Sequence, residues 1–146
     1  MEIRATEYRL AAEEHLSAAA QCHLSGDYLT CHYLSGLAVE CMLRAYRWRI
    51  DGSWDGRHVL PKLYRESRFD ALVSKTEYSR MADSFSLITS RWSNGHRFTS
   101  PAKLARYLNE IGATHNIKGD KLKRHSSEIF EAAEYIVGLG VNKWKN

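Results

Sequence analysis

Long apolar runs are missing from this chain of 146 residues. No stretch approaches the roughly 20 consecutive apolar residues that a membrane-spanning helix needs. The opening decapeptide MEIRATEYRL lacks the apolar segment of a secretory signal peptide. Cysteine is scarce and odd in number, and Cys22, Cys31 and Cys41 each fall within a helical pattern. We therefore expect a cytoplasmic protein that binds no membrane and keeps its thiols buried and reduced.

The signatures of several kinds of site are also missing. There is no Gly-rich phosphate loop, no Ser-His-Asp signature and no carboxylate cluster spaced for a metal ion. Cys22-His23 and Cys31-His32 lack the spacing of a tetrahedral zinc site, because adjacent residues point to different faces of a helix. The sequence thus predicts neither a metal nor a cofactor. Strand-like alternation, internal repeats and low-complexity tracts are absent too, which leaves one all-helical domain over residues 1–146.

The most informative stretch spans residues 27–48. Its apolar residues recur at alternating steps of three and four, which predicts a helix. This stripe consists of Cys31, Leu34, Ala38, Cys41, Ala45 and Trp48. Other apolar residues fill most of the remaining circumference, so the helix is expected inside a bundle. Gly36 suggests that another backbone passes close to it, while Glu40 and Arg44, four residues apart, can pair along one face.

Further helices are predicted on both sides of this stretch. Residues 6–24 form the first, and Gly26 and Asp27 suit a helix end and an N-cap, which predicts an antiparallel hairpin. Shorter helices are expected within residues 57–67, at 75–92, and from Ser100-Pro101 to Gly112. A long C-terminal helix spans 121–139, where Gly138 and Gly140 are expected to end it. The predicted fold is an all-α bundle of two long antiparallel N-terminal helices, shorter helices and a long C-terminal helix.

The net charge of +4 is unevenly distributed along the chain. Residues 1–90 carry 11 Lys and Arg against 12 Asp and Glu, whereas residues 91–146 carry 10 against 5. No acidic residue lies between Asp83 and Glu110. This asymmetry suggests a surface that faces a polyanion, with nucleic acid as the first candidate, but from charge alone a solvated basic surface is the slightly favoured interpretation.

The two N-terminal helices resemble the opening hairpin of HEPN domains, small helical modules that bind nucleotides or cleave RNA. Residues 33–45, YLSGLAVECMLRA, are similar to the family form Y-L-x-G-x-A-V-E-x-x-L-[KR]-A. They follow an Ala-rich first helix and a Gly-Asp-Tyr turn. The RHVL segment at residues 57–60 and the last helix fit the family as well. The resemblance spans most of the chain and implies a helical bundle that forms a homodimer.

The functional signature motif of that family is an Arg followed, after four to six residues, by a His. Arg91 and His96 fit it with four residues between them. In catalytic relatives, the resemblance implies RNA cleavage without a metal ion. Arg91 would hold the scissile phosphate and His96 would help to move the proton of the attacking 2′-hydroxyl. Because residues 93–95 should end the helix, the side chains of Arg91 and His96 are both expected at its C-terminal end. Glu40, Asn94 and Arg97 are expected to support this site.

A second register of the same stretch points to a different function. Trp92 stands where the catalytic relatives carry a polar residue. Read from Trp92 to Arg97 and Phe98, the stretch is similar to the Trp-x4-Arg-Tyr segment of relatives that accompany nucleotidyltransferases and bind nucleotides without cutting. The first hypothesis is therefore a metal-independent endoribonuclease of toxin or defence type, with an antitoxin as partner. The second is a non-catalytic nucleotide- or RNA-binding partner of a nucleotidyltransferase, and the third is a dimerising scaffold.

Other residues are candidates for contacts with nucleic acid. The predicted phosphate or nucleotide contacts are Arg97, Lys103, Arg106 and Arg124. The aromatic residues that either stack on bases or pack at a helix end are Trp92, Phe98 and Tyr107. His125 lies at the start of the last helix, where a solvated position is the favoured interpretation over a phosphate contact. Glu40 is interpreted equally as a partner of Arg44 and as a group that orients Arg91 or His96.

Overall fold

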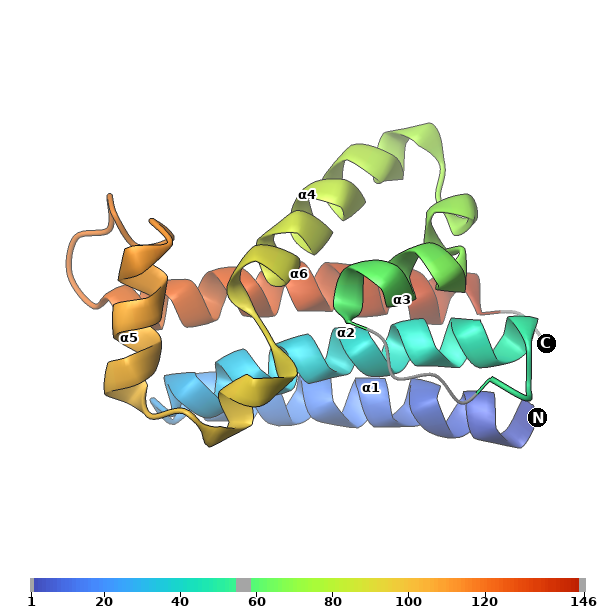
Figure 1. The fold of residues 1–146 in the computed structure, drawn as a ribbon, viewed down its shortest axis with the longest axis horizontal. Helices are drawn as coiled ribbons and strands as arrows, with labels where there is room; N and C mark the ends of the chain where they lie inside the picture. The colour runs from blue at the N-terminus through green and yellow to red at the C-terminus, as the bar shows by residue number, and fades with distance from the viewer. Residues whose placement is uncertain (1, 55–58, 145–146) are drawn as a thin grey trace.

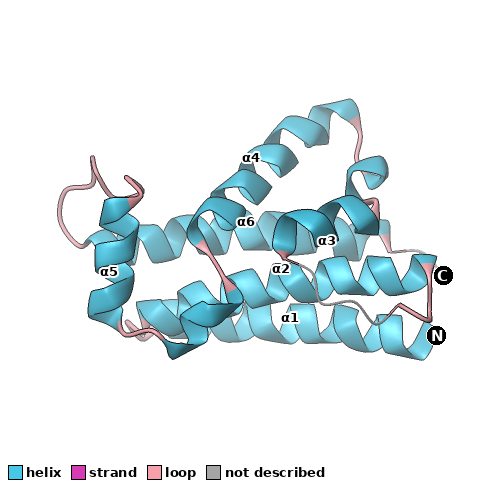
Figure 2. Cartoon of the chain, viewed as in Figure 1, coloured by secondary structure: helices cyan, strands magenta, loops and turns pink. Residues whose placement is uncertain are grey.

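Three long helices lie side by side and form the base of the molecule. The computed structural model describes residues 2–54 and 59–144. Helices α1 (Glu2–Leu24) and α2 (Tyr28–Ile50) form an antiparallel hairpin, and α6 (Lys121–Lys143) packs on both of them (Figure 1). All regular structure within the described residues is helical (Figure 2). The predicted all-α bundle with two long N-terminal helices and a long C-terminal helix is therefore confirmed.

The chain between α2 and α6 forms shorter helices that cover this base. They are α3 (Leu60–Ser67), the 3₁₀ helix η1 (Phe69–Leu72), α4 (Lys75–Arg91), the 3₁₀ helix η2 (Asn94–Phe98) and α5 (Pro101–Glu110). Helix α4 packs on α6, while α3, η2 and α5 all contact α2. In Figure 1, α5 lies at the end of the bundle that holds the α1–α2 turn, and both termini lie at the opposite end. Helix α2 is thus the central element that its apolar stripe predicted.

The predicted helix signals account for several of the observed ends. Gly26 has a positive φ of 84° after α1, and the Asp27 carboxylate accepts the Thr30 N–H at 3.2 Å. The Ser100 hydroxyl accepts the Lys103 N–H at 3.2 Å at the start of α5. An N-cap of this kind contributes about 1 kcal/mol to helix stability. Local residue types therefore fix the places where the chain turns toward the site described below.

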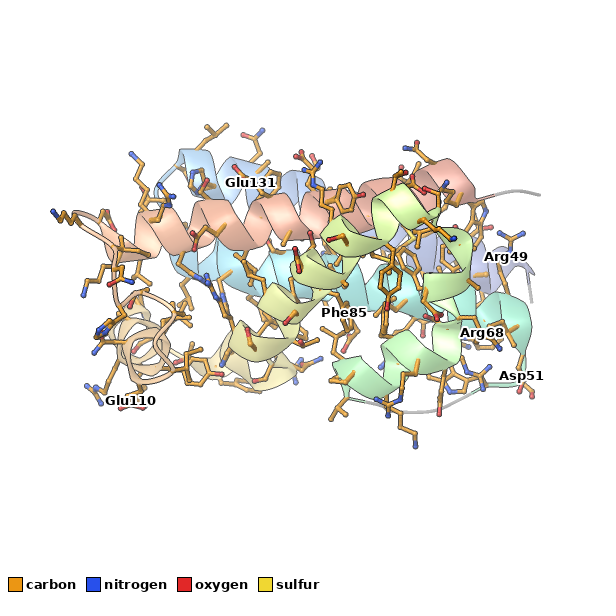
Figure 3. The ribbon with its side chains drawn as sticks, turned by 90° about the horizontal axis from the view of Figure 1, so that it is seen from above. Arg49, Asp51, Arg68, Phe85, Glu110 and Glu131 are labelled. Carbon is orange, nitrogen blue, oxygen red and sulfur yellow. The ribbon has the colours of Figure 1, made fainter. Side chains whose placement is uncertain are left out.

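The core fills the space between the base and the covering helices. Phe69, Met42 and Leu63 are fully buried. Phe85 of α4 stacks on Tyr64 of α3, with ring centroids 4.1 Å apart, in the region between those helices seen in Figure 3. Helices α3 and α4 pack their apolar faces on α2 and α6. Because short helices are only marginally stable in isolation, this burial of side chains is what stabilises the covering helices.

The end of α6 differs from the prediction. Gly138 and Gly140 do not end the helix, which continues to Lys143. A Cβ atom added at Gly140 would lie 2.5 Å from Cγ and Sδ of Met42, and the Tyr46 hydroxyl donates to the Gly140 carbonyl at 2.6 Å. Gly140 therefore lets α2 approach α6 closely. Two glycines resemble a helix end in sequence, but here tertiary contacts override their weak helix propensity.

Smaller boundary differences follow the same pattern. Helix α1 begins at Glu2 rather than at residue 6, and η1 was not predicted. Helix α3 begins at Leu60 with Pro61 in its first turn. The predicted start of that helix at residues 57 and 58 lies outside the described residues.

The three cysteines are free thiols, although Cys22 is less buried than predicted. Cys31 and Cys41 are buried and Cys22 is partly buried, and none of the three forms a disulfide. Burial raises the pKa of the Cys41 thiol to about 12. A buried thiol that stays protonated at neutral pH is unreactive, so Cys41 serves the core and not the chemistry of a site.

Candidate functional site

Three histidines from three separate elements form a hydrogen-bonded chain at the end of the bundle near α5. His32 of α2 lies in the middle. Its Nδ1 is 2.7 Å from Nε2 of His125 in α6, and its Nε2 is 2.8 Å from Nδ1 of His96 in η2. We refer to His96, His32 and His125 as the histidine chain. Its short N···N distances require that one nitrogen of each pair donates and the other accepts.

Each end of the histidine chain meets a group that can only donate. At the inner end, Nη1 of Arg91 is 3.4 Å from Nδ1 of His125. At the outer end, the backbone N–H of Ser93 points to Nδ1 of His96 at 3.3 Å. Neither a guanidinium nor a backbone N–H can accept a hydrogen bond. Both nitrogens that face these donors must therefore carry a lone pair.

Each of these two fixed donors requires the same direction of hydrogen-bond donation along the histidine chain, which runs from His125 through His32 to His96. Since His125 accepts at Nδ1, its proton is on Nε2 and is donated to Nδ1 of His32. His32 then carries its own proton on Nε2 and donates it to Nδ1 of His96. His96 is left with its proton on Nε2, the nitrogen that takes part in neither of these contacts. Starting from Ser93 instead of Arg91 gives the same three tautomers, so all three neutral rings are satisfied together.

Burial keeps the histidine chain neutral. His32 and His125 are fully buried, whereas His96 is half-buried. Burial, together with the neighbouring histidines and the Arg91 guanidinium, lowers the pKa of His32 well below 6.5. Burial and Arg91 lower the pKa of His125 to about 4, although Glu128 opposes this shift, and burial lowers the pKa of His96. At neutral pH the network is therefore uncharged.

We expect this arrangement to make the protein acid-labile. Below its ordinary pKa of 6.5, the unfolded state protonates His125 while the folded state does not. The unfolded state binds more protons, so the free energy of unfolding falls as the pH falls from 6.5 toward 4. His125 alone should contribute a loss of about 2 kcal/mol between pH 6.5 and pH 5. Urea unfolding at successive pH values measures the slope.

Two variants test whether the buried rings cause this slope. His125→Gln keeps polar atoms at the position but removes the titrating ring, and its slope should be visibly shallower than that of the parent. The matched control is His115→Asn, which removes an exposed histidine from the α5–α6 connection and should leave the slope unchanged. A parental slope in His125→Gln would show that the ring does not cause the acid lability.

The sequence suggested that Arg91 and His96 lie together at the end of one helix, but the structure does not bring them together. Arg91 ends α4 and turns toward α6, where it contacts His125 and pairs with Glu128 at 2.9 Å. His96 lies in η2 and faces His32 and the ring of Tyr107, whose centroid is 5.1 Å away. The two predicted residues instead occupy opposite ends of the histidine chain. The reason is that α4 ends at Arg91, and the separate helix η2 begins at Asn94 and packs on α2 with His96.

Glu40 and Asn94 lie close to this site without contacting His96. Glu40 pairs with Arg44 along α2 at 3.7 Å, as predicted. Its carboxylate also accepts from the Asn94 amide at 3.4 Å, which ties η2 to α2. Of the two roles weighed from the sequence, Glu40 has the first, pairing with Arg44, and a modified form of the second. It pairs within its helix, and it positions the turn that carries His96 rather than the ring itself.

Trp92 is a packing residue. Only 7% of it is exposed, and its indole N–H donates to the Tyr33 carbonyl at 3.1 Å. A Cβ atom added at Gly36 would lie 2.2 Å from three atoms of the Trp92 ring. The expectation that a backbone passes close to Gly36 is therefore wrong in detail, because the neighbour is this side chain. Burial of Trp92 between Arg91 and Ser93 fixes the path of the chain into η2.

Exposed basic and aromatic residues lie on η2, which carries His96, and on α5, whose Tyr107 contacts His96. Phe98 is 79% exposed, and the Arg97 guanidinium lies 4.5 Å from the centre of its ring. Lys103 and Arg106 are exposed on α5. Tyr107 is half-buried and donates to the Ser90 carbonyl at 3.4 Å. Of the three aromatic candidates for stacking, Phe98 is therefore the most exposed.

A cavity of about 420 Å³ lies at the inner end, beside Arg91. Arg91, Arg124 and Lys118 line it together with Glu128, and the rest of its wall comes from the connection between α5 and α6. Arg124 shares the Glu128 carboxylate with Arg91, at 3.5 Å. One carboxylate thus faces three cationic side chains. The local excess of positive charge suits an anion such as a phosphate group.

His32 was not among the predicted site residues, and His125 was weighed as a phosphate contact but interpreted as a solvated residue. His125 is fully buried, so its interpretation as a solvated helix start is wrong. A signal was present, because His125 precedes the buried Ile129 by four residues and so lies on the same face of α6. His32 stood out as a polar residue on an apolar helix. Neither pattern reveals that the two rings meet, since 93 residues separate them.

Within residues 2–54 and 59–144, no three His, Cys, Asp or Glu side chains are placed to hold a metal ion together. No helix in the described part of the chain is both long and apolar enough to cross a bilayer. A scan against protein-family models, a search of curated proteins and a search of solved structures each found no match.

Proposed function

We propose that this protein is an endoribonuclease that cleaves RNA without a metal ion and uses His96 as its proton-transfer group. The observation that carries the proposal is the histidine chain, which leads from two fully buried rings to one half-buried ring. Buried polar networks of this kind are costly to assemble and are concentrated at functional sites. The resemblance of the hairpin to HEPN domains points to the same residue.

The chemistry of RNA cleavage suits such a site. The 2′-oxygen forms a bond to phosphorus while the bond to the 5′-oxygen breaks. One proton leaves the 2′-hydroxyl, and one is delivered to the departing 5′-oxygen. His96 is the only member of the histidine chain that is not fully buried. The basic surface formed by Arg97, Lys103 and Arg106 would hold the RNA backbone, and the open ring of Phe98 would stack on a base.

A homodimer would complete the site. Within one copy, Arg91 and His96 lie at opposite ends of the histidine chain and do not contact one phosphate together. A second copy would supply further cationic groups near His96, in line with the dimer that the family resemblance implies. An antitoxin or another protein encoded with this one would then act by covering His96 and the surrounding basic surface.

The test is cleavage of bulk tRNA and of a mixed-sequence RNA by the purified protein in EDTA. We expect RNA to be cut and DNA of the same sequence to survive, because DNA lacks the attacking 2′-hydroxyl. An absence of cutting would contradict the proposal if RNA still bound with an affinity that fell steeply with salt. That result would favour the second candidate, a non-catalytic binding partner of a nucleotidyltransferase. The cationic cavity beside Arg91 favours this candidate.

A further inference from the structure

The direction of the histidine chain sets what His96 can do. With the tautomers derived above, the outer nitrogen of His96 carries a proton. A base must offer a lone pair, so the resting His96 cannot accept the 2′-hydroxyl proton at that nitrogen. It could do so only if all three rings exchanged their tautomers. The proton of each ring would then be on Nδ1, and Nε2 of His96 would be free to accept.

Arg91 prevents this reversal in the resting structure. A reversed chain would place the N–H at Nδ1 of His125 against Nη1 of Arg91, which is only 3.4 Å away. Two donors would then face each other without an acceptor. Arg91 also cannot take the proton, since a guanidinium remains charged at any ordinary pH. As long as Arg91 stays in contact with His125, the chain is held in one direction. The Ser93 N–H also faces Nδ1 of His96 at 3.3 Å, but Ser93 is exposed, so water can accept this N–H when the chain reverses.

An acceptor becomes accessible when Arg91 moves. The Glu128 carboxylate lies 2.9 Å from Nη1 of Arg91, on the same side of His125. The cavity that Arg91 lines also contains Arg124 and Lys118, so an anion entering it would compete with Glu128 for the guanidinium. A phosphate binds Arg through two parallel hydrogen bonds and is a strong competitor. Glu128 would then be released to accept from His125.

We propose that Arg91 gates a proton path through the histidine chain, and that a phosphate group bound in the cavity opens it by drawing Arg91 away from His125. This inference rests on the proposed function. On opening, Nε2 of His96 releases one proton to solvent, His32 and His125 each pass their Nε2 proton to Nδ1 of the next ring outward, and solvent in the cavity supplies one proton to Nδ1 of His125. In the open state, a proton accepted at Nε2 of His96 is then balanced by transfer from Nδ1 of His96 to His32 and from Nδ1 of His32 to His125. The last proton leaves Nδ1 of His125 for Glu128. Each ring ends neutral, and His32 and His125 act as positioning residues.

The reverse movement supplies the second proton of the reaction. Glu128 returns its proton to Nδ1 of His125, each ring passes one proton outward, and Nε2 of His96 releases one to the departing 5′-oxygen. No net charge is left in the buried chain at either stage. This matters because the surroundings disfavour a charged ring: Arg91 faces His125, and the other two rings face His32.

The test is nitrogen NMR of protein labelled at its histidine rings, which reports whether Nδ1 or Nε2 carries the proton. We expect all three rings of the parent to carry it on Nε2. In Arg91→Ala, the population should shift to Nδ1 without any ligand. The matched control is Arg124→Ala, which removes the other guanidinium bound to Glu128 but does not touch His125, so its tautomers should match the parent. Arg91→Gln keeps more of the side-chain volume and repeats the test if the alanine variant does not fold.

Two probes identify the anion. Titration with inorganic phosphate and with a 2′-deoxy dinucleotide, which cannot be cleaved, should move the parent toward the Nδ1 form. A response to both shows that any phosphate suffices, and a response to the dinucleotide alone assigns the cavity to a nucleic-acid backbone. Parental tautomers in both Arg91 variants, or no response to either probe, would overturn the gate. Because nothing is cleaved here, this result is independent of the nuclease assay, and active protein with unchanged tautomers would reject the gate alone.

Discussion

In the His96→Ala variant, RNA cleavage is expected to slow by a factor of about 10² to 10⁴, the usual contribution of a positioned acid or base. The loss should fall on kcat rather than on KM, because the substitution leaves the basic residues Arg97, Lys103 and Arg106 in place. His96 is half-buried in the short helix η2, so water can replace its contact with His32 and the long helices should not move. Initial rates at several RNA concentrations separate the two constants.

His15→Ala is the matched control for this variant. His15 is a partly buried histidine on α1 that takes no part in the histidine chain. Its rate of cleavage should stay within about twofold of the parent, since truncations away from a site rarely change the chemistry. If His96→Ala cuts as fast as the parent while both variants remain folded, His96 is not the proton-transfer group and the proposed mechanism is wrong.

The elements of this fold were predictable where local residue types determine them. The apolar stripe of α2 gave a buried helix, and Ser100-Pro101 and Gly26-Asp27 gave helix ends that the structure confirms. These signals depend on neighbours within a turn or two of the chain, so one sequence contains them in full. The HEPN resemblance added a site hypothesis centred on Arg91 and His96, and that hypothesis remains a proposal.

The hydrogen-bond connections within the candidate site were not predictable in the same way. It depends on where η2 lies over α2 and on how α6 presents His125, and both are results of long-range packing. The same histidine would be solvated if α6 were rotated by about half a turn. Gly140 shows the same limit, because its meaning depends on Met42 of another helix. Sequence periodicity identifies a face, but it does not identify the residue that the face meets.

Gly36→Ala tests this long-range packing where it supports the site. A methyl group at Gly36 would lie 2.2 Å from three atoms of the buried Trp92 ring, far inside van der Waals contact. The flat indole cannot bend away as a flexible side chain would, so the ring or the backbone that carries it must shift. Overpacking of this kind costs about 1–3 kcal/mol, and it exceeds the gain of roughly 1 kcal/mol from replacing glycine within a helix. We expect a net loss in the free energy of urea unfolding.

Gly138→Ala supplies the matched control, because it makes the same change in a different helix. Apart from Gly138 itself, its two chain neighbours and the nearby backbone of α6, no atom lies within 4 Å of a Cβ added at Gly138. Here only the gain in helix propensity remains, so the variant should be more stable than the parent by about 0.5–1 kcal/mol. The two substitutions should therefore have opposite signs. Equal stability of the two variants would mean that Trp92 does not pack on Gly36.

The effect of Gly36→Ala should extend to the site as well. Trp92 stands between Arg91, which holds the inner end of the histidine chain, and Ser93, whose N–H holds the outer end. Displacing the indole also shifts the start of η2 and with it His96, so RNA cleavage should fall even under conditions where the variant is fully folded. Gly138→Ala, which leaves Trp92 alone, should keep the parental rate. A folded Gly36→Ala variant with full activity would show that cleavage does not depend on the position of Trp92.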